Sequence, residues 1–328
     1  MGTPTRVLGR TGIPLSPMGL GCWAIGGPFW EGDRPLGWGA VDDDESVRAI
    51  RRGIDLGVTF FDTADVYGAG HSERVLGRAL AGVRDQVVVA TKFGNTFDER
   101  TRQMGEPDVS PAYVRRACEA SLRRLGTDRI DLYQLHVGHL PAGEAEAALE
   151  ALEALARDGL VRAYGWSTDD PGCARLFAGR PHYAAVQFDF NVLLDAPEMV
   201  ALCDELDLAG INHGPLAMGL LTGKFHAGSR LGADDVRGDA APGWMRYFTD
   251  GRPSPEWLER LAAIRDVLTS GERTLAQGAI AWIWARSGRT VPIPGFRTVR
   301  QVEENAGAME RGPLTAEQLA DVDALLGR

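Results

Sequence analysis

Short apolar segments alternate with longer helical patterns eight times along the chain, and this repeat restricts the fold more than any other feature. Most of these segments are apolar throughout, as expected of parallel strands covered on both faces. Strand–helix alternation of this length predicts an α/β fold, a closed (β/α)8 TIM barrel. The predicted strands are 18–23, 58–61, 86–91, 130–135, 161–166, 184–188, 208–212 and 290–294.

Several helices between these strands have recognisable ends. Ser110 and Pro111 mark the start of one helix and Gly126 its stop, and "SPEWLERLAAIRDVLTSG" repeats the pattern. Thr315 and Gln318 form a capping-box pattern. Ahead of the first barrel strand, "RVLGRTGIPLS" predicts a small β-hairpin, centred on Gly12, that closes the bottom of the barrel.

The length of 328 residues is normal for one barrel domain, and no linker or low-complexity segment interrupts the chain. We therefore expect a single domain over residues 1–328. Two long irregular regions, 24–42 and 217–253, fall where barrel strands end. Barrel enzymes keep their active sites at that face, so both regions are expected to border a functional site.

Composition excludes several functional classes. The net charge of −10 argues against a nucleic-acid surface, and no apolar run is long enough for a transmembrane helix. The first residues lack the apolar core of a secretory signal, so we expect a cytoplasmic protein. The four cysteines show no paired spacing, which favours reduced thiols. The histidines have no close ligand spacing, so no metal is expected. Oligomeric state stays open.

Two nucleotide-binding patterns fail on inspection. "GLGCWA" (19–24) fits the dinucleotide glycine pattern, but "IGGPFW" follows where the phosphate-binding helix would have to begin. "GLLTGK" (219–224) is one residue short of a P-loop. Neither a Rossmann domain nor a P-loop is therefore expected.

Polar residues at three consecutive predicted strand ends make a stronger signal. Asp62 and Tyr67 follow the second strand, Lys92 the third and His136 the fourth. Strand ends converge on one pocket in a barrel. A lysine cation lowers the pKa of a neighbouring tyrosine, and a buried lysine needs a carboxylate partner. This set predicts proton transfer, with Tyr67 as the acid and His136 orienting a carbonyl oxygen.

Each residue also has an ordinary structural interpretation. Asp62 and Asp65 could cap turns, Tyr67 could pack against the chain, Lys92 could lie at the surface, and His136 could be a core histidine. Their joint occurrence at consecutive strand ends favours the functional interpretation. Asp65 has no assigned chemistry and is expected to shape the turn that carries Tyr67.

The sequence resembles the aldo-keto reductases over nearly its whole length. "FFDTADVYG", "VVVATKFG", "SLRRLGTDRIDLYQLH", "GLVRAYGWST", "GPLAMGLLTGKF" and "VPIPGFRTVRQVEENAGA" follow the order and spacing of that family, closest to its bacterial and potassium-channel β-subunit-like branches. The resemblance implies a barrel that binds NADPH across its mouth without a Rossmann domain. It also implies a catalytic tetrad of Asp62, Tyr67, Lys92 and His136.

The resemblance assigns further residues to the cofactor and substrate. Thr168 replaces a usual asparagine, and His213 replaces a usual aromatic residue that stacks on the nicotinamide. Arg297 suits the 2′-phosphate, which favours NADPH over NADH. The implied cofactor contacts are Gly21, Cys22, Trp23, Asp62, Ser167, Thr168, Gln187, His213, Gly214, Pro215, Leu216, Lys224, Gly295, Arg297, Gln301, Glu304 and Asn305. The implied substrate contacts are Trp23, Trp30, Phe93 and His136, with Phe29 or Trp38 of the 24–42 loop as further candidates.

The function predicted from these features is NADPH-dependent reduction of an aldehyde or ketone to an alcohol. An aromatic pocket wall favours apolar carbonyl compounds. Two alternatives remain: an NADPH-binding regulatory or redox-sensing subunit with little turnover, and a metal-free lyase or isomerase that uses the same tyrosine, lysine and histidine.

Overall fold

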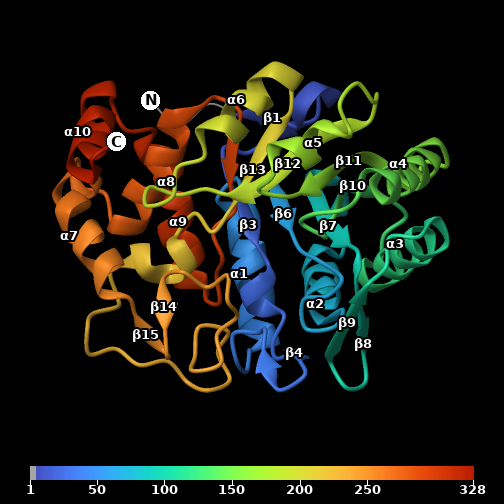
Figure 1. The fold of residues 1–328 in the computed structure, drawn as a ribbon, viewed down its shortest axis with the longest axis horizontal. Helices are drawn as coiled ribbons and strands as arrows, with labels where there is room; N and C mark the ends of the chain where they lie inside the picture. The colour runs from blue at the N-terminus through green and yellow to red at the C-terminus, as the bar shows by residue number, and fades with distance from the viewer. Residues whose placement is uncertain (1–4) are drawn as a thin grey trace.

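The computed structural model describes residues 5–328, so residues 1–4 of the expected domain lie outside the description. Its central feature is an eight-stranded parallel sheet with the order β16-β13-β12-β11-β10-β7-β6-β3 (Figure 1). All eight predicted strands are present. They are β3 (Gly19–Gly21), β6 (Phe60–Asp62), β7 (Val88–Phe93), β10 (Ile130–Leu135), β11 (Val161–Ser167), β12 (Tyr183–Asp189), β13 (Ala209–His213) and β16 (Thr290–Pro292).

The two ends of this sheet meet and close the barrel. Gly21 forms a parallel bridge with Gly295, and its amide donates to the carbonyl of Pro294 at 3.1 Å. A side chain at Gly21 would place its Cβ 2.7 Å from the carbonyl oxygen of Ile293, so this seam requires a glycine. The (β/α)8 barrel predicted from the sequence is confirmed.

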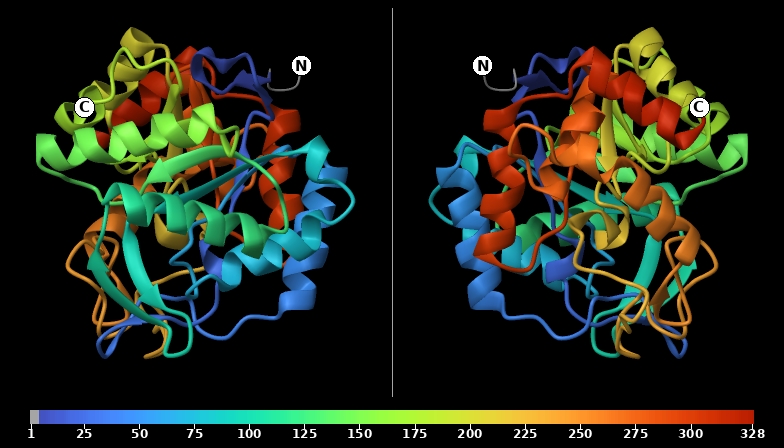
Figure 2. Two further views of the ribbon diagram at one scale, coloured as in Figure 1. Left: turned by 90° about the vertical axis from the view of Figure 1, so that its right-hand side faces the viewer. Right: turned by 90° about the vertical axis from the view of Figure 1, so that its left-hand side faces the viewer.

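Helices surround the barrel on the outside (Figures 1 and 2). They cover the strands with their apolar faces, which explains why the strands are apolar on both sides. The helices are α1 (Asp43–Asp55), α2 (His71–Leu80), α3 (Pro111–Leu125), α4 (Ala142–Arg157), α5 (Pro171–Arg175), α6 (Pro197–Leu206), α7 (Pro255–Thr269), α8 (Leu275–Arg286), α9 (Val299–Arg311) and α10 (Ala316–Leu326), with short 3-10 turns η1 (Gly9–Thr11), η2 (Trp23–Ile25), η3 (Arg84–Gln86) and η4 (Ala217–Thr222).

Most of the expected helix ends are present. The Ser110 side chain accepts a hydrogen bond from the Tyr113 amide at the start of α3. Thr315 and Gln318 form the reciprocal capping box of α10. Ser254 lies at the N-cap position of α7, but its side chain makes no capping hydrogen bond. None of the helices within residues 5–328 is long and apolar enough to cross a membrane.

The N-terminal hairpin closes the bottom of the barrel, as the sequence predicted. Strands β1 (Arg6–Val7) and β2 (Pro14–Leu15) pair antiparallel at the end of the molecule marked by the N-terminus in Figure 1. Leu8, Ile13 and Leu15 are buried with inward-facing strand residues such as Phe60 and Leu132. The hairpin therefore covers the bottom of the barrel, and a ligand can reach the interior only from the opposite end.

The open end carries elements that the sequence did not predict. Strands β4 (Trp30–Glu31), β5 (Arg34–Pro35), β8 (Asn95–Asp98) and β9 (Gln103–Pro107) form a four-stranded sheet. Strands β14 (Phe248–Thr249) and β15 (Arg252–Pro253) form a second antiparallel pair. The two long loops also join each other, since Trp38 bridges to Asp235 and the Val236 amide donates to Gly37 at 2.8 Å.

Candidate active site

The four residues predicted to form a tetrad come together at the open end of the barrel. Asp62 ends β6, Lys92 lies within β7, and His136 follows β10, three neighbouring strands of the sheet. The Lys92 ammonium donates to Asp62 Oδ1 at 2.5 Å, to the Thr63 carbonyl at 2.8 Å and to the Tyr67 hydroxyl at 3.4 Å. Asp62 and Tyr67 are thus joined through one buried cation.

Two glutamines hold the second oxygen of Asp62. Gln134 Nε2 donates to Asp62 Oδ2 at 3.0 Å, and Gln187 Nε2 donates to the same atom at 2.8 Å. Both carboxylate oxygens of Asp62 therefore have hydrogen-bond partners. Gln134 was not predicted from the sequence, although a glutamine inside the apolar strand "IDLYQL" was a usable signal.

Tyr67 is positioned by a turn that requires a glycine. Gly68 has φ +62°, and a Cβ there would lie 1.8 Å from the Gly26 carbonyl oxygen. The tyrosine ring stacks on Trp23, with centroids 5.9 Å apart, and meets the His136 ring edge-on at 5.8 Å. Asp65, two residues earlier, is buried and does not line the pocket.

Burial sets the protonation states of this group. It raises the pKa of Tyr67 above its usual value, and the Lys92 cation offsets this only in part. Lys92 alone would lower this pKa, so the direction expected from the sequence is wrong. Burial by itself would lower the pKa of Lys92, but Asp62 and Tyr67 outweigh it and the pKa is raised. Before any ligand binds, the pair is therefore a neutral phenol beside an ammonium.

His136 is neutral for related reasons. Burial, and then the charge of Lys92 and the proximity of His213, hold the pKa of His136 well below its usual value. Its Nδ1 is buried without a hydrogen-bond partner among the described residues. A neutral imidazole carries one N–H group, which can orient an oxygen atom without transferring a full charge.

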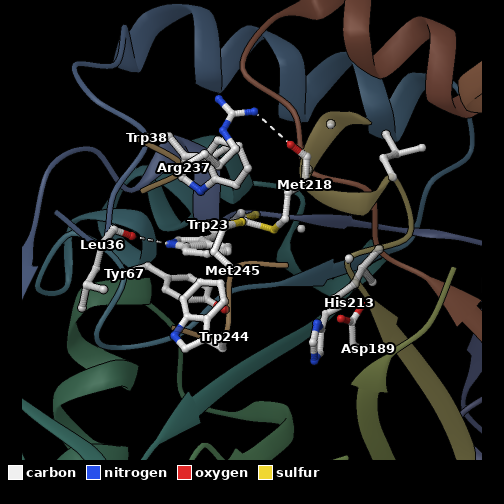
Figure 3. Close-up of a pocket in the computed structure, with 18 of the residues that line it drawn as sticks. Trp23, Leu36, Trp38, Tyr67, Asp189, His213, Met218, Arg237, Trp244 and Met245 are labelled. Atoms are coloured by element: carbon white, nitrogen blue, oxygen red, sulfur yellow. Dashed lines mark hydrogen bonds between the residues drawn. The ribbon is translucent and has the colours of Figure 1, made fainter. Parts of the chain in front are cut away.

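Asp62, Tyr67 and His136 line a pocket of about 700 Å³, whereas Lys92 is fully buried and does not line it. Trp23 forms one wall and is fixed by a 3.0 Å hydrogen bond from its indole to the Leu36 carbonyl (Figure 3). The ring of Trp38 meets the ring of Trp23 edge-on, with centroids 5.3 Å apart. The ring of Trp244 also lies against Trp23, with centroids 6.1 Å apart. Trp244 and Met245 come from the 217–253 region, and the sequence analysis did not identify them.

The structure brings most of the predicted cofactor residues to this pocket. They come from the ends of five strands, from the segments that follow these strands and, for Gln301, from α9. The predicted residues that line it are Gly21, Cys22, Trp23, Asp62, Ser167, Gln187, His213, Gly214, Pro215, Leu216, Lys224, Gly295, Arg297 and Gln301. Asp189 also lines it, beside His213 across the β12–β13 pair, and was missed from sequence (Figure 3).

Other predicted residues do not reach the pocket wall. Phe93 is fully buried and stacks on Tyr133 at 4.6 Å. Trp30 pairs within the four-stranded sheet, opposite Pro35 and Gln103. The Thr168 hydroxyl donates to the Gly138 carbonyl instead. Glu304 and Asn305 belong to α9 and are absent from the pocket lining.

One end of the pocket is electropositive. Lys224, Arg237 and Arg297 all line it. Arg237, which the sequence analysis missed, is paired with Asp235 at 2.6 Å and lies over the Trp38 ring at 4.3 Å. Burial and these two arginines lower the pKa of Lys224, whose ammonium has no hydrogen bond or ion pair within residues 5–328.

A model of the aldo/keto reductase family matches residues 17–326. The chain belongs to the aldo/keto reductase family. The aldo-keto reductase yakc of Schizosaccharomyces pombe, whose name carries NADP(+), is 30% identical over 94% of this chain and 88% of that protein. This confirms the family that the motifs indicated.

Solved structures of other aldo-keto reductases share the fold. The glycerol dehydrogenase AKR11B4 from Gluconobacter oxydans is 30% identical, with a TM-score of 0.82 over 100% of this chain and 96% of that one. An aldo-keto reductase from Klebsiella pneumoniae in complex with NADPH is 26% identical, with a TM-score of 0.70 over 99% of this chain and 95% of that one.

Proposed function

We propose that this aldo-keto reductase uses NADPH to reduce an aldehyde or ketone to an alcohol, with Tyr67 as the proton donor. The observation that carries the proposal is the chain of contacts from Tyr67 through Lys92 to Asp62 at the base of an aromatic pocket. The NADP named for a relative and the NADPH bound in a related structure support the choice of cofactor.

The residues of the pocket fit this cofactor. Three cations face a single buried carboxylate, Asp235, so the electropositive end of the pocket has excess charge for a phosphate. We assign Lys224, Arg237 and Arg297 to the phosphates. At the other end, Gln187 uses its Nε2 on Asp62, which leaves Oε1 as the acceptor for a carboxamide N–H. Ser167 and His213 are assigned to the same end.

When bound, NADPH supplies the hydride, and the side chains manage the proton. Tyr67 donates its hydroxyl proton to the carbonyl oxygen as negative charge develops there. The Lys92 ammonium then stabilises the phenolate that remains, and Asp62 keeps that ammonium charged and in position. His136 donates its N–H to the same oxygen. A positioned acid of this kind contributes roughly 10²–10⁴-fold in rate.

Trp23, Trp38 and Trp244 favour an apolar or aromatic carbonyl compound. The test is steady-state oxidation of NADPH and of NADH by purified protein with a panel of aromatic aldehydes, ketones and sugars. We expect turnover with aromatic aldehydes and a preference for NADPH. Tight NADPH binding with no turnover would instead indicate a regulatory subunit, and absence of nicotinamide binding would indicate a lyase or isomerase.

A further inference from the structure

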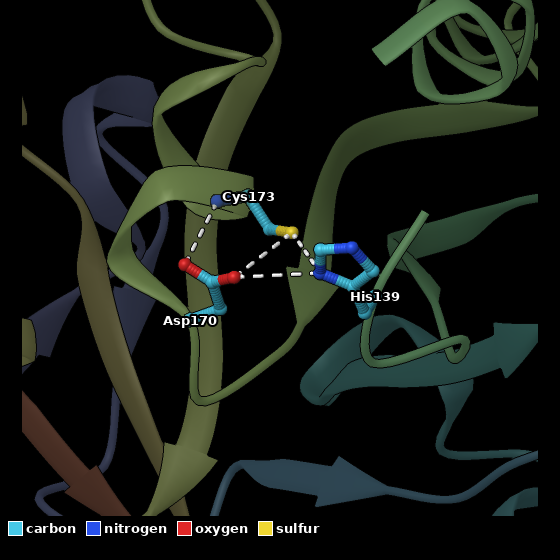
Figure 4. Close-up of side chains that lie close together, drawn as sticks. All are labelled: His139, Asp170 and Cys173. Carbon is cyan, nitrogen blue, oxygen red and sulfur yellow. Dashed lines mark hydrogen bonds and ion pairs between the residues drawn. The ribbon is translucent and has the colours of Figure 1, made fainter. Parts of the chain in front are cut away.

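Three side chains that can bind a metal converge outside the pocket, beside the ends of β10 and β11. Cys173 Sγ lies 3.2 Å from His139 Nδ1, and Asp170 Oδ2 lies 3.5 Å from the sulfur and 3.4 Å from the same nitrogen (Figure 4). None of the three lines the pocket. The spacing in sequence conceals the cluster, since His139 and Cys173 are 34 positions apart.

The triangle has the dimensions of three corners of a tetrahedral zinc site. Zinc binds sulfur, nitrogen and oxygen at about 2.3, 2.0 and 2.1 Å, which places neighbouring ligand atoms roughly 3.3–3.6 Å apart. The three observed separations, 3.2, 3.4 and 3.5 Å, need changes of only a few tenths of an ångström. The set of one thiol, one imidazole and one carboxylate also suits zinc.

The backbone around the cluster holds the ligands in place. Asp170 Oδ1 accepts hydrogen bonds from the amides of Gly172 and Cys173 at 2.7 and 3.3 Å, which leaves Oδ2 to face the other two ligands. Thr168 donates to the Gly138 carbonyl and accepts from the Asp170 amide at 3.1 Å. One hydroxyl therefore joins the loop that carries His139 to the loop that carries Asp170.

The geometry does not match a nucleophilic triad. In a triad one imidazole nitrogen contacts the nucleophile and the other contacts the acid. Here His139 Nδ1 faces both Cys173 Sγ and Asp170 Oδ2. Three atoms that converge on one point are the arrangement of a ligand set, not of a proton relay.

We propose that His139, Asp170 and Cys173 bind a divalent zinc-like cation. The side chains of His139 and Asp170 are 76% and 47% exposed, so the ion can enter from solvent and keep a water molecule as its fourth ligand. Binding forms a metal–sulfur bond and releases the thiol proton of Cys173 to solvent. The ion would join the loop after β10 to the start of α5. Its ligand His139 lies three residues after His136, and its ligand Asp170 lies three residues after Ser167.

The test is titration of chelator-treated, reduced protein with Co²⁺, followed by Zn²⁺ competition. We expect one Co²⁺ per chain, with a near-ultraviolet thiolate-to-cobalt band and the intense visible bands of tetrahedral Co²⁺. Zn²⁺ should remove these bands and raise the unfolding temperature by mass action. A spectrum without the thiolate band would overturn the proposal.

Variants identify the ligands. Cys173→Ser should remove the thiolate band. His139→Gln and Asp170→Asn should each weaken binding by at least about 100-fold, since even changes around the ligands cost ~10–100-fold. Asparagine remains a good N-cap, so Asp170→Asn should keep α5 folded. Circular dichroism of each variant distinguishes loss of a ligand from loss of the fold.

Two matched controls complete the test. Cys203→Ser replaces another buried thiol, and His182→Gln removes a histidine that pairs with Glu153 at 2.8 Å. Both should bind Co²⁺ as the unchanged protein does. A band that survives Cys173→Ser, or that disappears in Cys203→Ser, would contradict the assignment.

Discussion

The Lys92 ammonium and the Asp62 carboxylate form an ion pair of 2.5 Å inside the barrel, with side chains 0% and 3% exposed. Removing one partner of such a pair leaves an uncompensated buried charge. The pair is also the only link between Tyr67 and the hydrogen bonds of Gln134 and Gln187 within the described residues. The acidity of Tyr67 therefore depends on contacts from four different strands.

Replacing Tyr67 with phenylalanine should strongly slow reduction and leave cofactor binding intact. Phenylalanine keeps the ring that stacks on Trp23 and removes only the hydroxyl. We expect kcat to fall by roughly 10²–10⁴-fold, measured by NADPH oxidation, with unchanged NADPH affinity by fluorescence titration. Tyr183→Phe is the matched control, since that buried hydroxyl has no partner among the described residues. Near-normal turnover of Tyr67→Phe would show that the proton comes from elsewhere.

The rate of reduction should be flat across neutral pH and fall only in strong alkali. Burial raises the pKa of Tyr67 above its usual value of about 10, so the phenol keeps its proton until then. Lys92→Met removes the charge that lowers the pKa of Tyr67, so the alkaline limb of kcat/KM should move to still higher pH in the residual activity. An inflection near pH 6.5 that disappears in His136→Gln would contradict a neutral His136, because burial holds the pKa of His136 well below that value.

Arg297→Ala should weaken NADPH binding far more than NADH binding. The guanidinium lies at the electropositive end of the pocket and donates to the carbonyls of Trp38 and Ala40. Loss of a charged hydrogen bond of about 1.5–3 kcal/mol corresponds to roughly 10–150-fold in affinity. Arg300→Ala, which changes an exposed arginine outside the pocket, is the control. Equal losses for both cofactors would mean that Arg297 only holds the 38–40 loop.

Asp65→Asn should stabilise the protein at neutral pH. Burial, and then the charge of Glu73, raise the pKa of Asp65 well above its usual value of about 3.9, and its Oδ1 has no partner among the described residues. The native state keeps this proton while the unfolded chain loses it. The stabilising contribution is therefore complete below pH ~4 and is lost as pH rises toward the native pKa.

Asparagine does not titrate, so the variant should lack this loss of stability. Denaturant unfolding at pH 4 and pH 7 gives the free energy of unfolding of both proteins. A larger decrease in this free energy between pH 4 and pH 7 in the variant than in the original protein would refute the raised pKa of Asp65. The position does not line the pocket, so turnover provides an independent check on the native fold.

The barrel and the convergence of Asp62, Tyr67, Lys92 and His136 were predictable because they depend on local patterns. Apolar strand segments and their polar ends stand at regular intervals, and Asp62, Lys92 and His136 needed only the order of the strands. The alternation of side chains along a strand explains why Phe93 does not reach the pocket. Neighbouring residues of a strand point to opposite faces, so the side chain after Lys92 points into the outer core.

The covering of the pocket was not predictable in this way. Trp244 and Arg237 reach it only because the 217–253 region folds back on the 24–42 loop, through pairs such as Val236 with Gly37. These contacts join segments about 200 positions apart and have no periodicity in sequence. Likewise, the direction in which the Tyr67 pKa shifts depends on how deeply the side chain is buried, and the sequence pattern does not show this burial.

The contact between Gly21 and Gly295 that closes the barrel also affects folding during synthesis. A chain emerging from the ribosome carries β3 long before β16, the strand at the other end of the sheet order. Until β16 has been made, one edge of β3 is unpaired, and the electropositive end of the pocket lacks Arg297. Nascent chains therefore carry an exposed strand edge until β16 has been synthesised and the barrel can close.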